Sequence, residues 1–334
     1  MRILEEAGFE CFLVTSKSHF DPDIDLFHKS KVVDLQVSAR RKIGTLFTIY
    51  KQIAAFRPNL IICDIPSRVP QCLLVFFLCI SKLGLVAIDD VVPHDKHDAP
   101  SKLVSIMQAL IVRQSAGILT FSSNSAELAK KKFKDKSVFA VPLITEISTF
   151  SNATPVPQNQ KKNFAMIGRW SEYKGFDIGA DIFDTYLKKH QSGSVLDVWC
   201  SGIDSPMFDH PNIVWRSTKS FTWQDLSKVL PTYKAVLMPY RSASQSGVQN
   251  LSWDAGVPCL VSDLAGLVEL QPAHLPGIPL GDIDAWTQAL FALDNQGAPD
   301  EIAIVGQAFS RSIRSKENVV NSFLVAVETV VGRS

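Results

Sequence analysis

Two cations stand five residues apart in the segment Met166–Gly175, MIGRWSEYKG: Arg169 and Lys174. An apolar run that is typical of a buried strand ends at Gly168, and a helix is expected to begin near Lys174. An arginine offers a planar fork of donors and a lysine a compact charge, and both suit the oxygens of a diphosphate. The spacing therefore predicts a diphosphate site at the carboxyl end of this strand. The alternative is a pair of surface cations in an ordinary loop.

A second segment, Pro239–Asp263, has the pattern of a strand end, a small-residue turn, a helix and the next strand. Ser246–Gly247 opens the helix expected at Gln249–Ala255, and Gly256 and Pro258 end it. Unpaired backbone N–H groups at a helix N-terminus bind anions, and the helix dipole adds roughly half a positive charge there. We therefore expect half of a nucleotide-diphosphate site. The alternative is an ordinary turn of a parallel sheet.

The segment Val86–Asp98, VAIDDVVPHDKHD, brings further polar side chains directly after an apolar strand. A histidine or carboxylate there, such as His94 or Asp90, could hydrogen-bond a substrate hydroxyl. The alternative is a solvated loop with no catalytic part. Four residues of this loop are possible metal ligands: His94, Asp95, His97 and Asp98. No Cys or His cluster elsewhere in the sequence completes a tetrahedral set, so no metal is expected.

The elements that must position these residues alternate between strand and helix along the whole sequence. This alternation is typical of parallel sheets covered on both faces. At 334 residues the chain exceeds the usual size of one core, so two doubly wound α/β domains are expected to face each other across a cleft. The expected parts are an N-terminal Rossmann-like domain at 1–150, a linker at 151–162, a C-terminal Rossmann-like domain at 163–315 with the expected diphosphate site, and a helix at 316–334 that packs back on the N-terminal domain.

The beginning of the sequence departs from this pattern. Met1–Gly8 reads as a helix with its glycine stop, and the strand Cys11–Thr15 follows directly. A Rossmann-like half usually opens with a strand and a glycine-containing turn. We therefore expect the first strand of the N-terminal domain to be missing. Either the chain starts downstream of its natural N-terminus, or the sheet has lost an inner strand.

Composition narrows the class of protein. Apolar residues make up 46% of the chain and charged residues 20%, and the formal net charge of +1 offers nucleic acid no global attraction. The six cysteines lie in or beside apolar runs without a CxxC pair, as small buried hydrophobes in a reducing cytoplasm. The most apolar segment, Cys72–Ile80, has about half the length needed to span a bilayer. The sequence contains no GxSxG, P-loop or Rossmann glycine motif, which argues against a hydrolase, an ATPase or a dehydrogenase.

Together, the motifs GR-x4-KG, PY-x4-QSGV-x7-GVP and DLAGLVE (Asp263–Glu269) resemble those of family 4 glycosyltransferases. That family has the GT-B fold, uses nucleotide-sugar donors and retains the anomeric configuration. The resemblance covers nearly all of the chain. It implies no metal and no other cofactor, because Arg, Lys and a helix terminus neutralise the diphosphate.

The resemblance also implies roles for particular residues. Those expected to bind the donor diphosphate are Arg169, Lys174, Ser246, Gly247 and Val248. Those expected to line the donor cleft are Gly168, Gln245, Gly266 and Glu269. His94 and Asp90 match the family's His-Asp-x3-His loop near the sugar and are the expected catalytic residues, while Asp89 replaces the first histidine of that loop.

Two positions depart from the common family pattern. Most members carry two glutamates eight positions apart around the phosphate helix, and Ala243 and Leu251 stand there in this chain. The sequence instead resembles the subgroup with a PYxxATQSGV-type loop, which is common among enzymes of surface-polysaccharide assembly. In that loop Ser244, Gln245 and Ser246 could take over polar contacts.

We therefore expect a retaining glycosyltransferase that moves a sugar from a nucleotide-diphosphate sugar to a glycan or lipid-linked glycan in surface-polysaccharide synthesis. The resemblance implies a cytoplasmic protein with peripheral contact at the inner face of the membrane. The alternative is a non-catalytic GT-B module that binds a nucleotide or a partner without turnover, which the missing strand and the two absent glutamates motivate. A sugar-nucleotide epimerase is a weaker interpretation, because no set of carboxylates can be assigned to its cleft.

Overall fold

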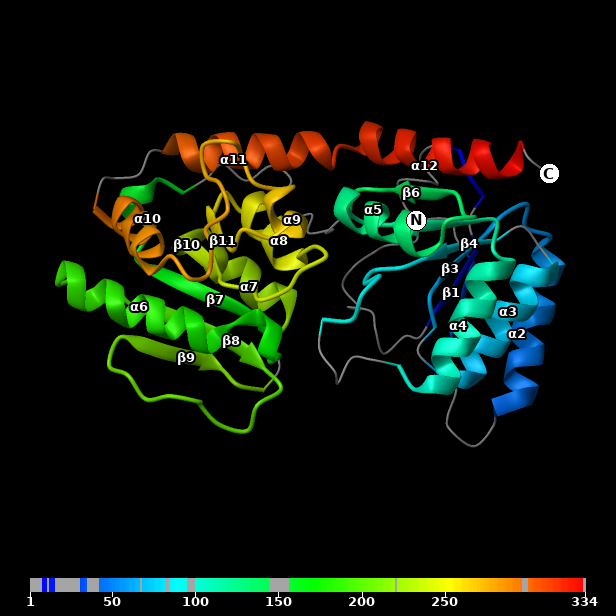
Figure 1. Ribbon diagram of the computed structural model, residues 1–334, viewed down its shortest axis with the longest axis horizontal. Helices are drawn as coiled ribbons and strands as arrows, with labels where there is room; N and C mark the ends of the chain where they lie inside the picture. Colours follow the sequence, from blue (N-terminus) through cyan, green and yellow to red (C-terminus); the bar gives the residue numbers. More distant parts are fainter. Residues whose placement is uncertain are drawn as a thin grey trace.

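The computed structural model describes residues 8–10, 12–15, 31–34, 42–66, 68–81, 84–94, 100–143, 156–219, 221–295 and 300–332. In this part of the chain two α/β domains lie side by side (Figure 1). Every pair of neighbouring strands is parallel. The expected fold class, two parallel-sheet α/β domains, is therefore confirmed.

The N-terminal domain contains a four-stranded parallel sheet and a separate parallel pair. The order of the larger sheet is β3 (Ile61–Asp64), β4 (Gly84–Ala87), β5 (Gly117–Thr120) and β6 (Val138–Ala140). All residues of β4 and β5 are buried, as expected for central strands with helices on both faces. Among the described residues up to 143, the helices are α2 (Lys42–Phe56), α3 (Val69–Ser81), α4 (Lys102–Gln114) and α5 (Ser123–Lys132).

The separate pair joins β1 (Phe12–Thr15) to β2 (Lys31–Asp34). The sequence pattern predicted β1 but not β2, which is a KVVD segment of only four residues. Most of the helix predicted at the start of the chain, residues 1–7, lies outside the described residues. The missing first strand therefore stays a prediction.

The C-terminal domain contains a five-stranded parallel sheet in the order β11-β10-β7-β8-β9. Its strands are β7 (Asn163–Arg169), β8 (Leu196–Ser201), β9 (Ile213–Ser217), β10 (Tyr233–Met238) and β11 (Cys259–Val261). Its helices are α6 (Phe176–His190), α7 (Trp223–Val229), α8 (Gly247–Asp254), α9 (Ala265–Val268), α10 (Ile283–Asn295) and α11 (Asp300–Ile313). The chain runs outward from β7 to β9 and then returns to the other side of β7, so the order reverses between β7 and β10. Ligands of such sheets bind at this switch point, outside the carboxyl ends of the strands.

The period of two along β7 separates the core of this domain into two layers. Phe164 and Met166 point into the cluster under α6 and α10, whereas Ala165 and Ile167 point into the cluster around α8. Residues 277–280, which follow α9, form no named strand among the described residues and make one isolated bridge between Ile278 and Ser262.

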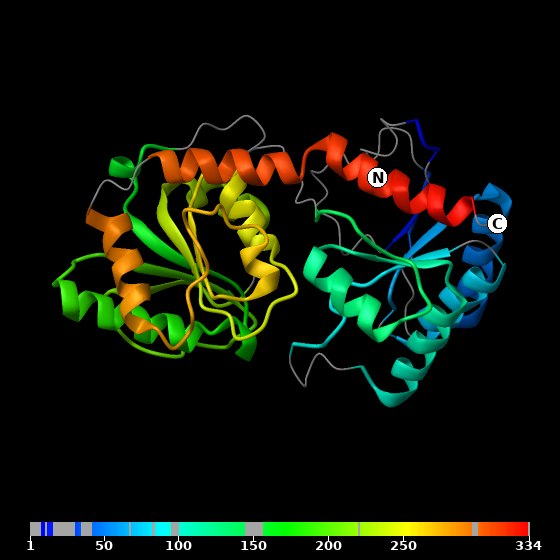
Figure 2. The same ribbon diagram turned by 45° about the horizontal axis from the view of Figure 1, so that its top comes forward.

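The last helix returns to the N-terminal domain. In Figures 1 and 2, α11 runs over the C-terminal domain and α12 (Lys316–Val331) continues over the N-terminal one. The side chains of α12 that pack into the core beside β4 and β5 are Val319, Phe323, Ala326 and Val330. The chain therefore crosses between the domains twice, once after β6 and once between α11 and α12.

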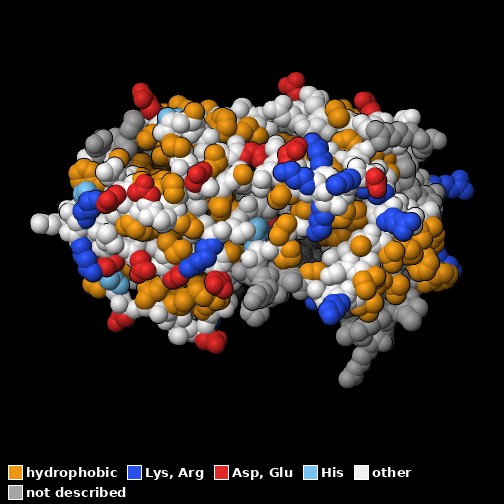
Figure 3. All heavy atoms as spheres, viewed as in Figure 1, with side chains coloured by type: hydrophobic (Ala, Val, Ile, Leu, Met, Phe, Trp, Pro, Cys, Tyr) orange, Lys and Arg blue, Asp and Glu red, His pale blue; other side chains and the backbone are white. Residues whose placement is uncertain are grey.

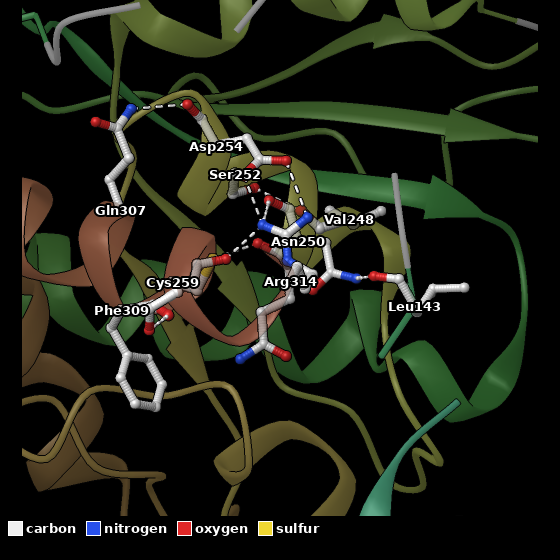
Figure 4. Close-up of polar contacts among 12 residues, drawn as sticks. Leu143, Val248, Asn250, Ser252, Asp254, Cys259, Gln307, Phe309 and Arg314 are labelled. Carbon is white, nitrogen blue, oxygen red and sulfur yellow. Dashed lines mark hydrogen bonds and ion pairs between the residues drawn. The ribbon is translucent and has the colours of Figure 1, made fainter. Parts of the chain in front are cut away.

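Both crossings are tied to α8 by polar contacts (Figure 4). The Arg314 guanidinium donates to the Asp254 carboxylate at 3.0 and 2.5 Å and to the Asn250 carbonyl oxygen at 3.3 Å. The Asn250 amide in turn donates to the carbonyl oxygen of Leu143, where the first crossing begins, at 3.3 Å. The helix expected to bind phosphate therefore also contacts both segments that cross between the domains.

Candidate active site

Two glycines shape the loop that follows β7. A Cβ atom on Gly168 would lie 2.9 Å from Lys174 Cδ, so the lysine stem passes directly over this glycine. After a 3-10 turn at Glu172–Lys174, Gly175 has the left-handed φ of 62°, and a Cβ atom there would lie 2.1 Å from the Pro239 carbonyl oxygen. Only glycine allows this approach, so the loop is held against the end of β10.

This path places both predicted diphosphate cations at the carboxyl end of β7. Lys174 Nζ donates to Tyr240 Oη at 3.0 Å, and it lies 4.5 Å from the Tyr240 ring centroid and 5.3 Å from that of Tyr173. Burial lowers the pKa of the Lys174 amine, but the Tyr240 and Tyr173 hydroxyls raise it by more, so its net pKa lies above the ordinary value. Arg169, the last residue of β7, is exposed. The amine is charged at neutral pH and is pre-positioned by two aromatic rings.

The second half of the predicted site is the N-terminus of α8. The helix begins at Gly247, two residues before the predicted start, and Ser246 is its N-cap, accepting from Gln249 N at 3.4 Å. Ser246 and Val248 are buried, and Gly247 is partly exposed. The buried Gln245 Oε1 has no hydrogen-bond partner among the described residues. The first turn of α8 therefore offers backbone donors beside a polar acceptor.

Arg241 joins the two halves, and the sequence analysis did not identify it. Its guanidinium donates to both carboxylate oxygens of Asp177, at 3.0 and 2.6 Å, and to the Glu172 carbonyl oxygen at 2.6 Å. Its backbone N–H donates to the Tyr173 carbonyl oxygen at 2.6 Å. A bidentate pair of this kind fixes orientation as well as distance. The loop before α8 and the loop after β7 are thereby held as one unit.

His94 and Asp90 reach this unit from the N-terminal domain. His94 Nδ1 lies 2.7 Å from Ser242 Oγ, and Nε2 lies 3.0 Å from Asp90 Oδ1 and 3.2 Å from Ser244 Oγ. The imidazole packs on the Tyr173 ring at a centroid distance of 4.8 Å, and its side chain is 10% exposed. The two predicted catalytic residues therefore contact each other and the loop before the phosphate helix.

The carboxylates of this loop differ in their tendency to ionise. Burial raises the pKa of Asp90, but hydrogen bonds from His94 and Ser244 lower it by more, so its net pKa lies below the ordinary value. For Asp89, burial and then the negative charges of Asp64 and Asp90 raise the pKa to about 6. Asp90 is thus a stable carboxylate, whereas Asp89 holds its proton at mildly acidic pH.

The two remaining residues predicted to line the donor cleft lie where the domains meet. A Cβ atom on Gly266 would come within 2.5 Å of the Ser244 carbonyl oxygen, so this glycine lets α9 rest on the loop before α8. The Glu269 carboxylate accepts from the backbone N–H of Ser123 at 2.8 and 3.0 Å and from that of Asn124 at 3.3 Å. Glu269 therefore contacts the first turn of α5 in the other domain.

Comparison with known proteins was made at the level of structure, since neither a protein-family model nor a curated protein sequence matches the chain. The sucrose-phosphate synthase of Thermosynechococcus elongatus superposes with a TM-score of 0.71 at 14% identity, over 100% of this chain and 92% of its own. The chain has the GT-B fold.

Other solved GT-B structures resemble it as well. HepE from Anabaena, in complex with UDP, gives a TM-score of 0.59 at 13% identity over 91% of this chain and 86% of its own. The pneumococcal O-GlcNAc transferase GtfA, in complex with UDP and GlcNAc, gives 0.62 at 12% identity over 85% of this chain. This chain spans 60% of the length of GtfA.

The two positions at which the family usually has a glutamate, Ala243 and Leu251, pack in or against the core of the C-terminal domain. Leu251 is 1% exposed and belongs to the core cluster around α8, and Ala243 packs against the same cluster. Leu251 therefore takes part in the core and offers no polar group to a ligand.

Among the described residues, no group of three His, Cys, Asp or Glu side chains is placed to hold a metal ion. Three of the four possible metal ligands named from the sequence, Asp95, His97 and Asp98, lie outside the described residues. Within the same described part, no helix is both long and apolar enough to cross a bilayer.

A separate hollow of about 470 Å³ lies at the amino ends of β7, β8 and β10, opposite the candidate site. Its Asp294 carboxylate accepts from Tyr186, Ser192 and Ser194 and pairs with Lys234. The buried His190 Nε2 of this hollow has no hydrogen-bond partner among the described residues. Ligands of parallel sheets bind at the carboxyl ends of the strands, however, so the switch point there is the better candidate.

Proposed function

We propose that this chain is a retaining glycosyltransferase that transfers a sugar from a nucleotide-diphosphate sugar to a glycan or lipid-linked glycan. The observation that carries the proposal is the convergence of three groups at the switch point of the donor sheet. They are the charged Lys174 amine, the N-terminus of α8 and the His94–Asp90 pair from the opposite domain. Positive charge and backbone donors on one side, and sugar-orienting groups on the other, suit a nucleotide sugar.

In the proposed reaction the bond between the sugar C1 and the diphosphate oxygen breaks. The acceptor oxygen bonds to C1 on the same face, and its proton passes to the departing phosphate oxygen. Arg169, Lys174 and the donors of Ser246, Gly247 and Val248 stabilise the negative charge that develops on the diphosphate. Asp90, kept ionised by its hydrogen bonds, orients the His94 imidazole beside the loop before α8. Neither a metal nor another cofactor is required.

The similar structures suggest which donor to test first. HepE and GtfA were both solved with UDP, and GtfA also with GlcNAc. Because both of these structures contain UDP, we propose a UDP-sugar as donor.

The motif resemblance to family 4 and to its PYxxATQSGV-type subgroup supports a place in surface-polysaccharide synthesis.

The N-terminal domain carries a surface that supports peripheral contact with the inner face of the membrane. Large apolar side chains that are more than 40% exposed follow one another over α2, α3 and α4: Phe47, Leu73, Phe77, Ile80, Leu103, Ile106 and Leu110. These helices contain no Asp or Glu, while Lys51, Lys102 and Arg113 lie among them. Figure 3 shows apolar and basic side chains gathered over this part of the molecule. An apolar surface with basic residues suits anionic lipid, so we propose a cytoplasmic protein that meets a lipid-linked acceptor at the membrane.

A non-catalytic GT-B module that binds a nucleotide without turnover is the second candidate. The specific observation in its favour is that the core residue Leu251 occupies one of the two glutamate positions and the apolar Ala243 the other. No donor-domain carboxylate is then assigned to the ribose or to the donor sugar.

A binding panel with a turnover assay separates the two candidates. The purified protein is screened for thermal stabilisation by UDP-, GDP- and ADP-sugars, because a ligand that binds only the folded state raises the melting temperature. Stabilisation by a UDP-sugar together with release of UDP in the presence of glycan acceptors supports the transferase. Stabilisation by UDP without transfer or hydrolysis supports the non-catalytic module, and no stabilisation by any nucleotide contradicts both.

A further inference from the structure

Ser244 lies at the centre of the contact between the two domains. Its backbone carbonyl oxygen accepts from Ser122 Oγ at 2.8 Å, and its own hydroxyl donates to Asp90 Oδ1. Ser244 is 6% exposed and Ser122 7% exposed, so water is largely excluded from the bond between them, whereas the Asp90 side chain is 45% exposed. One residue of the donor domain therefore contacts two separate segments of the N-terminal domain.

Glu269 makes the second contact across the same boundary. The first N–H groups of a helix have no partner within the helix, and the dipole favours a negative charge beside them. At α5, the N-cap Ser122 satisfies Ser125 N, and the Glu269 carboxylate satisfies the N–H groups of Ser123 and Asn124. The carboxylate caps a helix 146 positions away in the chain.

Ser244 and Glu269 are also joined to the proposed phosphate helix. Gly266 holds α9, which ends at Glu269, against the backbone of Ser244. The buried Gln249 side chain of α8 donates to the Leu267 carbonyl oxygen of α9 at 2.8 Å. Ser244 and Glu269 are therefore connected to α8 through close packing and this hydrogen bond.

We propose that Ser244 and Glu269 are positioning residues that form an interdomain clasp, made by the bonds of Ser244 to Ser122 and Asp90 and of Glu269 to the first turn of α5. The clasp holds the cleft closed, sets the first turn of α8 and holds His94–Asp90 against the loop before it. Its effect on a nucleotide rests on the proposed function, whereas the closure itself does not.

The test compares three variants with the wild type and with a matched control. Glu269→Ala removes the cap, Glu269→Gln keeps its shape without its charge, and Ser244→Ala removes the hydroxyl but keeps the carbonyl oxygen. The control is Glu127→Gln on α5, because the Glu127 carboxylate is exposed and pairs only with Lys130 on the same helix among the described residues. Circular dichroism and thermal unfolding verify that each variant is folded.

The first readout is the radius of gyration from small-angle scattering, measured without ligand. We expect an increase for Glu269→Ala, a smaller one for Glu269→Gln and Ser244→Ala, and none for the control. Faster amide exchange at Ser123 and Asn124 should accompany the increase in both Glu269 variants. The second readout is the dissociation constant of UDP, which we expect Glu269→Ala to raise about 3- to 10-fold because fewer molecules are closed.

The outcomes separate the clasp from other roles. An unchanged radius of gyration in all three variants overturns it, even if UDP binding weakens, because Glu269 would then act by contact with the ligand alone. An increased radius without any UDP binding by the wild type supports the clasp and contradicts the proposed function. An increased radius together with weaker UDP binding supports both.

Discussion

Lys174 and the loop that carries it are held by side chains that lie far away in the chain. Lys174 donates to Tyr240, 66 positions away, and Arg241 pairs with Asp177 from 64 positions away. The tyrosine rings keep the ammonium close to the end of β7 without neutralising it, as a carboxylate would. The charge therefore stays available for an anion, and its position is set before any ligand binds.

We expect Arg169→Ala or Lys174→Ala to lower the rate of sugar transfer by about 10- to 1000-fold, or about one to four kcal/mol of transition-state stabilisation. Transfer is measured at saturating acceptor with the donor found in the nucleotide panel. Lys188→Ala is the control, because this lysine is 76% exposed and pairs with Asp184 on the surface of α6. Full activity in both active-site variants would contradict the assignment of the diphosphate site.

At the scale of elements, longer helices and strands were easier to predict from the sequence than very short ones. The strand expected at Cys11–Thr15 is β1 at Phe12–Thr15, and the helix expected at Gln249–Ala255 is α8 at Gly247–Asp254. The short β2 was missed because four residues show too little alternation. The start of α8 was placed two residues late because glycine is a poor helix former, while the Ser246 cap stabilises that start.

The turn after β7 depends on Gly175 more than on any neighbouring side chain. We expect Gly175→Ala to lower the free energy of unfolding by at least about 2 kcal/mol, because alanine is strained at this φ and its Cβ would meet the Pro239 carbonyl oxygen. Gly193→Ala is the matched control, since a Cβ there meets nothing within 4 Å, and we expect a change within about 0.5 kcal/mol. Urea unfolding followed by tryptophan fluorescence measures both, and equal stabilities of the two variants would contradict the close approach.

At the scale of the whole molecule, two segments of the chain cross between the domains, one after β6 and one between α11 and α12. The domains are also joined by the contact across the cleft and by the packing of α12 on the N-terminal domain. Arg314 lies where α11 gives way to α12, and its side chain is 5% exposed. A charge this deeply buried needs its partner, because the cost of desolvation remains when the partner is removed. The Asp254–Arg314 pair therefore connects the second crossing to α8.

Removing Arg314 tests this tie. We expect Arg314→Ala to lower the free energy of unfolding by about 3 kcal/mol, and the double change with Asp254→Leu to recover part of the loss because no charge is then left unpaired. The measurement is a double-mutant cycle by urea unfolding. Lys188→Ala, which breaks a surface pair, should cost less than about 0.5 kcal/mol. A cost equally small for Arg314→Ala would show that the pair does not hold the crossing.

The apolar and basic surface of α2, α3 and α4 carries a prediction at the same scale. We expect the wild type to float with vesicles that contain phosphatidylglycerol, and the double change Phe77→Glu/Ile106→Glu to lower the partition at least about tenfold. Ile304→Glu is the control, because Ile304 is 51% exposed on α11, away from this surface. Equal flotation of all three proteins, or none by the wild type, would contradict membrane contact at this surface.

The sequence by itself determined the alternation of strands and helices, the division into two parallel-sheet domains and the loops that carry Arg169, Lys174 and Ser246. These follow from local rules, because side chains directly after the strands of a parallel sheet gather at its carboxyl edge. Only the tertiary structure decided which groups meet there. Glu269 reaches α5 and His94 reaches Ser242 across 146 and 148 positions of chain, and such contacts depend on how two domains are oriented. Orientation is set by the packing of surfaces, which no local spacing encodes.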